Sequence, residues 1–272
     1  MLTLHIQPIN SAHGAANPST RRGVAFTFDD GMSGRGIREI LAVAVAERVP
    51  VTFFPTAGSL RRYPELWREI AAAGFAIGNH TSGHHSLTDL LATKGEVAVR
   101  AAILAWVAAA DEIGIPTVLF LRPPYGEHNR KTDAIAIAAG MKYVVNWGAT
   151  FADTAPRCSG TIAGRIAHAT SGGQGVVVLG HTGALGRAYE PMTARVFAEV
   201  IRSYRKRKIT PVSLDTMYGA LPRVIDWTLA ARATSAPAVT GSPRVPTSTP
   251  KPYPRAALAL SPGAAAHVCA AP

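Results

Sequence analysis

Short apolar runs alternate with helix-like segments along most of this chain, and this alternation restricts the fold more than any other feature. The runs recur between residues 23 and 215, and the stretches between them carry apolar residues at helical spacing. Such a pattern is typical of βα units around a parallel sheet. It predicts about seven strands, beginning near Val24, Val51, Phe75, Thr117, Lys142, Val176 and Ile209. We therefore expect an α/β fold.

Helix signals fill the segments between the predicted strands. One apolar face is formed by Ile37, Ile40, Leu41, Ala44 and Val45. Pro64 can open a second helix that Gly74 closes, and Gly114 and Gly140 end two more. These signals place a helix after most of the strands, as a βα architecture requires.

The composition divides the chain into three parts. A length of 272 residues with 47% hydrophobic residues suits one domain with a sizeable core. Eight prolines lie between Pro237 and Pro272, where such a composition cannot bury enough apolar surface to order the chain. We predict an N-terminal arm at 1–22, one folded domain at 23–220, and an extension at 221–272 that is disordered from about residue 235.

The chain is strongly basic, with a net charge of +11. Such an excess favours encounter with an anionic partner, and nucleic acid, an anionic cell wall and a membrane surface all fit it. The densest basic run, 202–208, closes a predicted helix, where cations complement the helix dipole. No recognisable nucleic-acid module accompanies this run, so specific nucleic-acid binding is not expected.

Compartment signals are sparse. Cys158 and Cys269 are the only cysteines, too few for a disulfide scaffold, although they can pair in an oxidising compartment. Residues 1–20 do not have the pattern of a signal peptide, and no run reaches the roughly 18 apolar residues of a membrane span. Either the protein is cytoplasmic, or the first residue lies downstream of the true start.

Polar clusters directly follow three of the predicted strands. Asp29 and Asp30 follow the first, His80 and His84 follow the third, and His181 follows the run that begins at Val176. In a barrel of parallel strands, the carboxyl ends converge on one face, where active sites lie. The three clusters are therefore expected to meet in space.

One carboxylate with two imidazoles is a common ligand set for a catalytic divalent metal, and zinc is the first choice. Taken singly, each part has an ordinary explanation, because HxxxH spacings arise by chance and adjacent aspartates often cap helices or turns. His80 and His84 can face one point, whereas His85 is turned away by one residue. One aspartate can bind the metal while the other serves as a base.

Five further histidines show no such pattern and are expected to be exposed or structural: His5, His13, His128, His168 and His267.

Five motifs resemble those of the polysaccharide deacetylases of the NodB-homology type, in the order of that family, between Gly23 and Tyr218. They are Thr27-Phe28-Asp29-Asp30-Gly31, His80-Thr81-Ser82-Gly83-His84, Arg122-Pro123-Pro124-Tyr125-Gly126, the segment around Trp147, and Leu179-Gly180-His181. The resemblance implies a distorted (β/α) barrel with fewer than eight strands. This agrees with the predicted count of about seven and makes residues 23–220 the catalytic domain.

The resemblance also implies roles for individual residues. Asp30, His80 and His84 are the metal ligands, with Zn²⁺ expected and Co²⁺ as an alternative. Asp29 is the general base, and His181 protonates the departing group.

Further roles follow from the third, fourth and fifth motifs. The backbone N–H of Tyr125 helps to hold the oxyanion, and Arg122 orients the base carboxylate. Trp147 and Leu179 wall a pocket for the acetyl methyl. Without the family, Arg122 is equally compatible with a surface ion pair, and Trp147 and Leu179 with ordinary core positions.

The fourth motif departs from the family pattern. The family usually has an aspartate three residues after the tryptophan, where this chain has Thr150, and a second tryptophan where it has Thr154. Loss of that carboxylate is expected to lower the pKa of His181, because a nearby anion favours the imidazolium. Asp153, assigned to the substrate pocket, is the candidate to serve instead.

Three functions follow from this reasoning. The first is hydrolysis of N-acetyl groups on a polymeric or oligomeric glycan of the peptidoglycan or chitin type, by a monomeric enzyme. The second is O-acetyl ester hydrolysis on a xylan-like polysaccharide, whose alkoxide leaving group needs less help from an acid. The third is a degenerate member that binds glycan without turnover.

Overall fold

A computed structural model describes residues 22–116, 120–154, 162–183, 192–218 and 223–235. Thr117, predicted to begin a strand, lies outside these ranges, as do both cysteines and His5, His13 and His267. The strands are β1 (Val24–Asp30), β2 (Val51–Pro55), β3 (Ala76–Ile77), β4 (Phe120–Leu121), β5 (Tyr143–Val144), β6 (Ala149–Thr150) and β7 (Val176–His181). The helices are α1 (Gly34–Ala46), α2 (Ala57–Arg62), α3 (Pro64–Ala72), α4 (Leu87–Glu112), α5 (Arg130–Ala138), α6 (Ile162–Ala169), α7 (Met192–Lys206), α8 (Leu214–Met217) and α9 (Trp227–Ser235).

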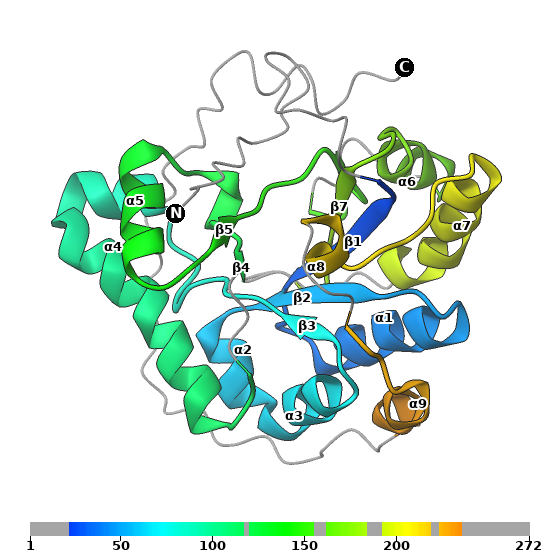
Figure 1. The fold of residues 1–272 in the computed structure, drawn as a ribbon, viewed down its shortest axis with the longest axis horizontal. Helices are drawn as coiled ribbons and strands as arrows, with labels where there is room; N and C mark the ends of the chain where they lie inside the picture. Colours follow the sequence, from blue (N-terminus) through cyan, green and yellow to red (C-terminus); the bar gives the residue numbers. More distant parts are fainter. Residues whose placement is uncertain (1–21, 117–119, 155–161, 184–191, 219–222, 236–272) are drawn as a thin grey trace.

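Every paired strand runs parallel to its neighbour within the described ranges. Five strands form one sheet in the order β3-β2-β1-β7-β6, and β4 and β5 form a second. A bridge between Asn79 and Leu121 joins the two beside β3. Helices surround the strands on the outside (Figure 1). This is the predicted distorted α/β barrel.

Seven strands lie within the described ranges, as predicted, but one member of the predicted set is wrong. The segment after Ile209 contributes only a single bridge, between Pro211 and Val24. The bridge is made by the Thr210 carbonyl and the Val212 N–H, and helix α8 begins soon after it, at Leu214. In its place β6, which was not predicted, pairs with β7 at Ala149 and Thr150.

The predicted helices are confirmed. Ile37, Ile40 and Leu41 of α1 are fully buried. Pro64 is the first residue of α3, and Gly74 follows that helix with a φ of 90°, a conformation that glycine adopts without strain.

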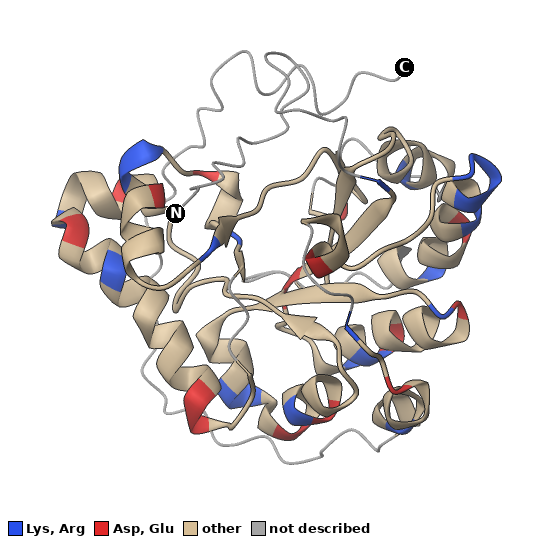
Figure 2. Cartoon of the chain, in the orientation of Figure 1, with Lys and Arg blue, Asp and Glu red and all other residues tan. Residues whose placement is uncertain are grey.

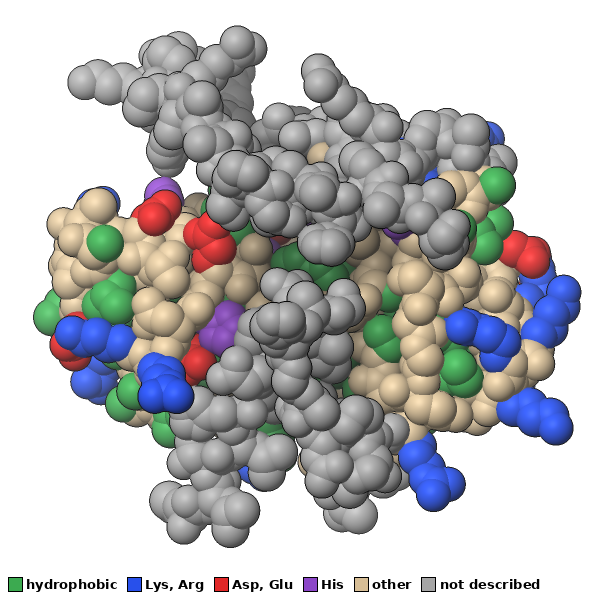
Figure 3. Space-filling view, turned by 90° about the horizontal axis from the view of Figure 1, so that it is seen from above, with side chains coloured by type: hydrophobic (Ala, Val, Ile, Leu, Met, Phe, Trp, Pro, Cys, Tyr) green, Lys and Arg blue, Asp and Glu red, His purple; other side chains and the backbone are tan. Residues whose placement is uncertain are grey.

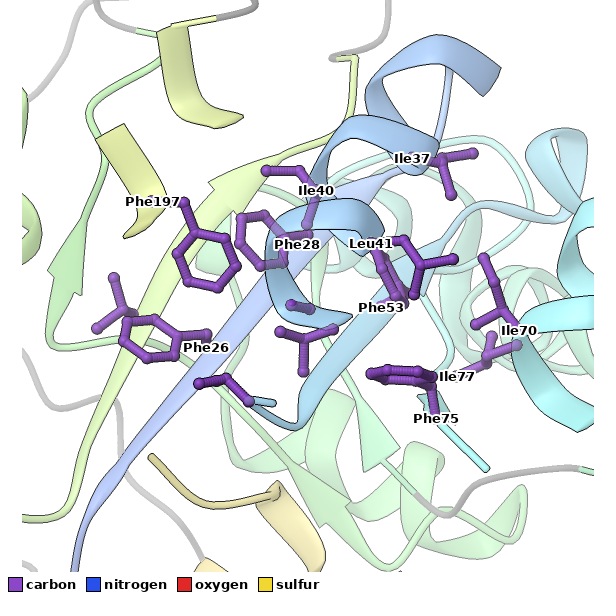
Figure 4. Close-up of a cluster of buried hydrophobic side chains, with 14 of the residues drawn as sticks. Phe26, Phe28, Ile37, Ile40, Leu41, Phe53, Ile70, Phe75, Ile77 and Phe197 are labelled. Carbon is purple, nitrogen blue, oxygen red and sulfur yellow. The ribbon is translucent and has the colours of Figure 1, made fainter. Parts of the chain in front are cut away.

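The outward face of the main sheet forms the largest part of the core. Val24, Phe26 and Phe28 alternate along β1 and pack beneath the surrounding helices. Phe197 of α7 meets Phe26 and Phe28 edge to face, with ring centroids 5.0 and 5.1 Å apart. Figure 4 shows these rings beside α1. Each fully buried phenylalanine contributes roughly 1.5–3 kcal/mol, so this layer holds β1 firmly in position.

The inward face of the same strands lines the barrel. Ala25 of β1, Phe54 of β2 and Val177 of β7 share an interior cluster with Phe120 and Val145. Because side chains alternate along a strand, Thr27 and Asp29 point to the same interior. The core therefore directs Asp29 toward the carboxyl-end opening of the barrel.

Charged side chains lie mostly on the peripheral helices (Figure 2). Lys and Arg also gather at the end of the molecule that carries α7 (Figure 3). There Arg202 pairs with Glu199, and Arg205 with Glu47. The basic run closes α7, as predicted. Among the described residues, no helix combines the length and apolarity needed to cross a membrane.

Helix α9 packs against α1 and α3, with Ala230 and Ala233 buried. The ordered part of the chain therefore continues beyond residue 220, while the three-part division remains a prediction.

Candidate metal centre and active site

Two adjacent carboxylates reach the same opening because the backbone turns sharply at the end of β1. Strict alternation would send Asp30 to the side opposite Asp29. Asp30 instead has a φ of 67° and Gly31 a φ of 69°. A Cβ at Gly31 would lie 2.5 Å from the Ser59 hydroxyl, so only glycine fits this turn. The turn brings both carboxylates to His80, whose Nε2 lies 3.2 Å from Asp30 Oδ1 and 3.9 Å from Asp29 Oδ2.

His80 and His84 meet through a tight turn rather than along a helix. Thr81 and His84 have φ values of 63° and 55°. The turn is held by Asn79, whose side chain accepts from the Thr81 N–H at 2.8 Å. The Nε2 atoms of both histidines lie 3.2 Å from the same oxygen, Asp30 Oδ1. The predicted convergence of these three residues is confirmed.

This arrangement fits a metal ion. The candidate ligand atoms of Asp30, His80 and His84 all lie within 4.8 Å of one another. His80 Nδ1 lies 2.7 Å from the Arg122 carbonyl oxygen, to which it donates, so Nε2 presents its lone pair to Asp30. His80 Nε2 is buried and makes no hydrogen bond within the described part of the chain. A buried lone pair of this kind is what a cation would satisfy.

Asp30 remains ionised in this setting. Burial by itself raises the pKa of the Asp30 carboxyl group, but the neighbouring imidazoles of His80 and His84 outweigh it and hold that pKa well below its usual range. An anionic oxygen therefore faces the two imidazoles at neutral pH.

Asp29 is held by a buried arginine. Arg122 has no exposed surface, and its Nη1 donates to both oxygens of Asp29 at 3.1 Å. Its Nε donates to the Val145 carbonyl at 2.6 Å and its Nη2 to the Thr27 hydroxyl at 3.0 Å. The surface ion pair considered for Arg122 is thus excluded, and its guanidinium fixes the Asp29 carboxylate.

His181 lies on the adjacent strand, at the end of β7, where its Cα is in register with that of Asp29. Its Nδ1 is 2.8 Å from Asp153 Oδ1, and its backbone N–H donates to Asp153 Oδ2 at 2.8 Å. Thr193 donates to the same Oδ2 at 2.7 Å. Both oxygens of the Asp153 carboxylate are therefore held, Oδ1 by the His181 ring and Oδ2 by the His181 backbone and Thr193.

This pairing corrects one expectation. Burial lowers the pKa of His181, but the charge and hydrogen bond of Asp153 overcome it and raise the pKa to about 9. The lower pKa expected from Thr150 is therefore wrong, because Asp153 supplies the missing carboxylate. Both oxygens of Asp153 are engaged with His181 and Thr193, and its assignment to the substrate pocket remains a prediction. The Thr150 hydroxyl accepts from the Ala152 N–H at 3.1 Å.

The remaining predicted site residues surround this centre. Tyr125 has a φ of 61° and is 60% exposed, and its ring centroid lies 4.6 Å from that of His84. The Trp147 ring lies 5.3 Å from the Arg122 guanidinium. Leu179 is buried on the inward face of β7. Their roles at the oxyanion and the acetyl methyl remain predictions.

Two other histidines are now placed. His85 is exposed, as the argument from spacing expected. His128 has a partner that was not foreseen, because its Nδ1 lies 2.8 Å from Asp133 and its side chain is only 7% exposed.

Three supporting residues were not singled out from the sequence. Thr27 is a polar residue within an apolar strand, and this could have marked it as a supporting residue. Asn79 immediately precedes His80. Thr193 lies forty positions from Asp153, and nothing local marks it.

Part of the chain is similar to known proteins. Residues 16–144 match the family model described as polysaccharide deacetylase. A chitooligosaccharide deacetylase from Rhizobium leguminosarum bv. trifolii is 31% identical over 129 residues, 47% of this chain and 58% of that protein. A peptidoglycan-N-acetylglucosamine deacetylase from Bacillus cereus is 31% identical over 116 residues, 43% of this chain and 41% of that protein. The chain thus spans about half the length of the curated relatives it matches.

The fold has a solved counterpart. A family 4 carbohydrate esterase from Streptomyces lividans superposes with a TM-score of 0.63 at 22% identity, covering 76% of this chain and 100% of that one. The predicted fold class is confirmed by this likeness.

Proposed function

Because residues 16–144 match the polysaccharide deacetylase family model, we propose that the chain removes N-acetyl groups from a glycan, using a divalent metal held by Asp30, His80 and His84. The observation that carries this proposal is the placement of two proton-handling groups beside the ligand triad. Asp29 and His181 sit in register on adjacent strands, and each has its own fixed partner. Hydrolysis of an amide needs one group to take a proton and another to give one.

Zinc fits the donor set best, since two imidazoles and one carboxylate are a common catalytic zinc site, and cobalt is the alternative. When bound, the cation would polarise the acetyl carbonyl and make water more acidic.

Asp29 is the base in this proposal. Arg122 holds its carboxylate in one orientation and keeps a positive charge beside it. Its Oδ2 lies 3.9 Å from His80 Nε2, close enough to the ligand triad to receive a proton from the attacking water.

His181 is the acid. With Nδ1–H donated to Asp153, the protonated ring presents Nε2–H to the departing nitrogen. A pKa of about 9 keeps the imidazolium populated at neutral pH. An amine must be protonated to leave, so this arrangement supports an N-acetyl substrate. A weakened acid would favour an O-acetyl ester, but the Asp153 contact keeps the proton on His181.

The substrate class is taken from the relatives, which are named for chitooligosaccharides and for peptidoglycan N-acetylglucosamine. The net charge of +11 supports encounter with an anionic wall polymer. The intact set of Asp29, Asp30, His80, His84, Arg122 and His181 argues against a purely binding role.

The test measures acetate released from three substrates, an N-acetylchitooligosaccharide, peptidoglycan and acetylated xylan. Protein stripped with a chelator is assayed alone and after addition of zinc or cobalt. We expect metal-restored release from an N-acetylated substrate. Acetate released from xylan alone would show ester hydrolysis instead. Acetate release that chelation does not affect would show that the activity needs no metal.

A further inference from the structure

Nearly all of the excess positive charge in the described ranges lies at one end of the barrel. The residues that form this basal patch are Arg22, Arg48, Arg202, Arg205, Lys206, Arg207 and Lys208, together with Glu47 and Glu199. The patch has a net charge of +5 from seven cations and two anions. The described residues outside it hold fifteen Lys and Arg and fourteen Asp and Glu, a net charge of +1. The excess charge is therefore a local feature of the surface.

Two helices contribute most of the basal patch. The run 202–208 ends α7, and Arg48 follows the end of α1 closely. Glu47 joins the two, because it accepts from Arg205 Nη1 at 2.7 Å and lies 3.8 Å from Arg202 Nη1. Basic residues are prominent on the side of the molecule that carries α7 (Figure 2). Segments far apart in the sequence thus share one charged surface.

Arg22 reaches the same surface from the start of the sheet. It lies just before β1, and Gly23 approaches Thr210 so closely that a Cβ there would lie 2.5 Å from the Thr210 carbonyl oxygen. This contact brings Arg22 to the end of the molecule that carries Lys208. The dipoles of α1 and α7 favour cations at their own carboxyl ends, but Arg22 belongs to no helix. Helix stabilisation alone therefore does not explain why all three segments are basic.

The cations of the basal patch are open to a partner. All seven are exposed, and only Arg202 and Arg205 form ion pairs, with Glu199 and Glu47. Within the described ranges, no ion pair is made by the other five, Arg22, Arg48, Lys206, Arg207 and Lys208. Outside those ranges the chain holds six Lys and Arg but a single acidic residue, Glu190. The chain itself therefore has little negative charge to offer the patch.

The chemistry of the basal patch selects the partner. Five of its seven cations are arginines, whose planar guanidinium binds a phosphate group through two N–H donors. None of the exposed large apolar side chains in the described ranges belongs to the patch, so it has nothing to insert among lipid acyl chains. The patch also has no exposed aromatic ring on which a nucleic-acid base can stack. These features favour a linear polymer with repeated phosphate groups and without bases.

The basal patch is remote from the metal ligands. Strand β1 begins beside the patch at Val24 and ends at Asp30, and six steps along an extended strand span roughly 20 Å. A polymer bound at the patch therefore leaves the carboxyl-end opening of the barrel free.

We propose that the basal patch is a docking surface for a linear phosphodiester polymer, separate from the opening that takes the acetylated glycan. Binding there holds the domain against anionic material and leaves the reaction centre accessible. The proposal goes beyond the proposed function and involves no turnover. Its failure and the failure of the proposed deacetylation are therefore distinguishable.

The test measures binding of the full chain to poly(glycerol phosphate) by calorimetric titration. The patch variant carries Arg48→Glu, Lys206→Glu and Lys208→Glu. The control variant carries three reversals on α4 and α5, namely Lys94→Glu, Arg100→Glu and Arg130→Glu. These two helices lie on the side of the molecule away from α7 (Figure 1). Each variant lowers the net charge of the chain from +11 to +5, so the two differ only in where the charge is removed.

The salt dependence of binding gives the expected sizes. Each phosphate neutralised on a flexible strand contributes about 0.7 to the slope of log Kd against log salt concentration. With about five phosphates bound, the Kd of the parent should rise on the order of 10²-fold between 50 and 200 mM salt. The patch variant should bind roughly 10-fold or more weakly than the control variant at low salt and should lose most of this salt dependence.

Equal affinities of the patch and control variants would overturn the proposal, because binding would then follow net charge alone. Tighter binding of the parent to phosphatidylglycerol vesicles or to duplex DNA, at equal phosphate concentration, would also overturn it and assign the patch to a lipid surface or to nucleic acid. Urea unfolding first establishes that both variants fold. If the patch variant does not, Lys206→Gln with Lys208→Gln replaces it and should still bind more weakly than Lys94→Gln with Arg100→Gln.

Discussion

Two groups of histidine and carboxylate residues lie at the carboxyl end of the barrel, and they are built for different tasks. In one, His80 and His84 direct their Nε2 atoms to the same oxygen of Asp30, each at 3.2 Å. In the other, His181 turns its Nδ1 to Asp153 at 2.8 Å. Both groups pair histidine with aspartate. In the first group the imidazoles approach the carboxylate with Nε2, and in the second with Nδ1.

The difference lies in what holds Nδ1. For His80 the partner is a neutral backbone carbonyl, which fixes the tautomer without adding charge. For His181 the partner is a carboxylate, whose charge raises the pKa to about 9. The first arrangement leaves a lone pair for a cation, and the second retains a proton that can be given away. The following experiments test this division.

The largest effect is expected for Asp30→Ala, because two neutral imidazoles without an anionic ligand hold a divalent ion poorly. Zinc content after dialysis should fall to background, and glycan deacetylation should be lost. Asp153→Ala is the matched control, since it removes a carboxylate from the other group and should retain the metal. Equal zinc content in Asp30→Ala and the parent would remove Asp30 from the ligand set.

The next largest effect is expected for Asp29→Asn, which keeps the ligand triad and removes the base. Turnover should fall on the order of 10²- to 10⁴-fold on every substrate, with zinc content unchanged. Arg122 then keeps a buried charge with a weaker partner, so the variant must first be shown to unfold cooperatively. A loss of zinc would show that Asp29 also contributes to the metal site.

His181→Ala separates the acid from the base through the leaving group. An amine needs a proton to depart, whereas a phenolate leaves readily. The variant should therefore lose far more activity on an N-acetylated glycan than on an aryl acetate, unlike Asp29→Asn. Equal losses on both substrates would take His181 out of the acid role.

A smaller and pH-dependent effect is expected for Asp153→Asn. Without the carboxylate the pKa of His181 should fall by roughly 1–3 units, which moves the alkaline limb of the kcat/KM profile toward lower pH.

The pH dependence of the free energy of unfolding should change as well. A raised folded-state pKa stabilises the protein fully below the unfolded value of 6.5, and this stabilisation is lost as pH rises through about 9. Urea unfolding at pH 6 and pH 9 should therefore differ less in the variant than in the parent.

The sequence predicted the metal group better than the acid group, and the reason is physical. Asp29, Asp30 and His181 follow buried strands directly, and parallel strands bring their ends together whatever the loops do. The fold class followed from the same alternation. The use of Asp30 rather than Asp29 as ligand came only from the family resemblance, because the choice depends on a φ of 67° that no local pattern reveals.

The errors fall where a contact is made far along the chain. Asp153 reaches His181 across 28 positions with help from Thr193, and the two-residue strand β6 is too short to show a period. The segment after Ile209 is apolar enough for a strand, but it makes one bridge with β1 before helix α8 begins at Leu214. Such features depend on tertiary pairing rather than on local sequence.

The smallest effect is expected for Thr150→Asp, which places a carboxylate where the family usually has one. The Nδ1 of His181 is already bound to Asp153, and the Thr150 hydroxyl instead accepts from the Ala152 N–H. A new anion at Thr150 can act on His181 only at longer range, where its influence is weaker. The alkaline limb of the kcat/KM profile should therefore move to higher pH, by less than it moves to lower pH in Asp153→Asn.

Thr150→Asn provides the neutral control. The double variant Thr150→Asp, Asp153→Asn tests whether a carboxylate at position 150 can replace the one at position 153. Full recovery of the alkaline limb in the double variant would show that the two positions are interchangeable and that Asp153 has no special geometry. No recovery would show that the 2.8 Å contact with Nδ1, rather than nearby negative charge, sets the pKa of His181.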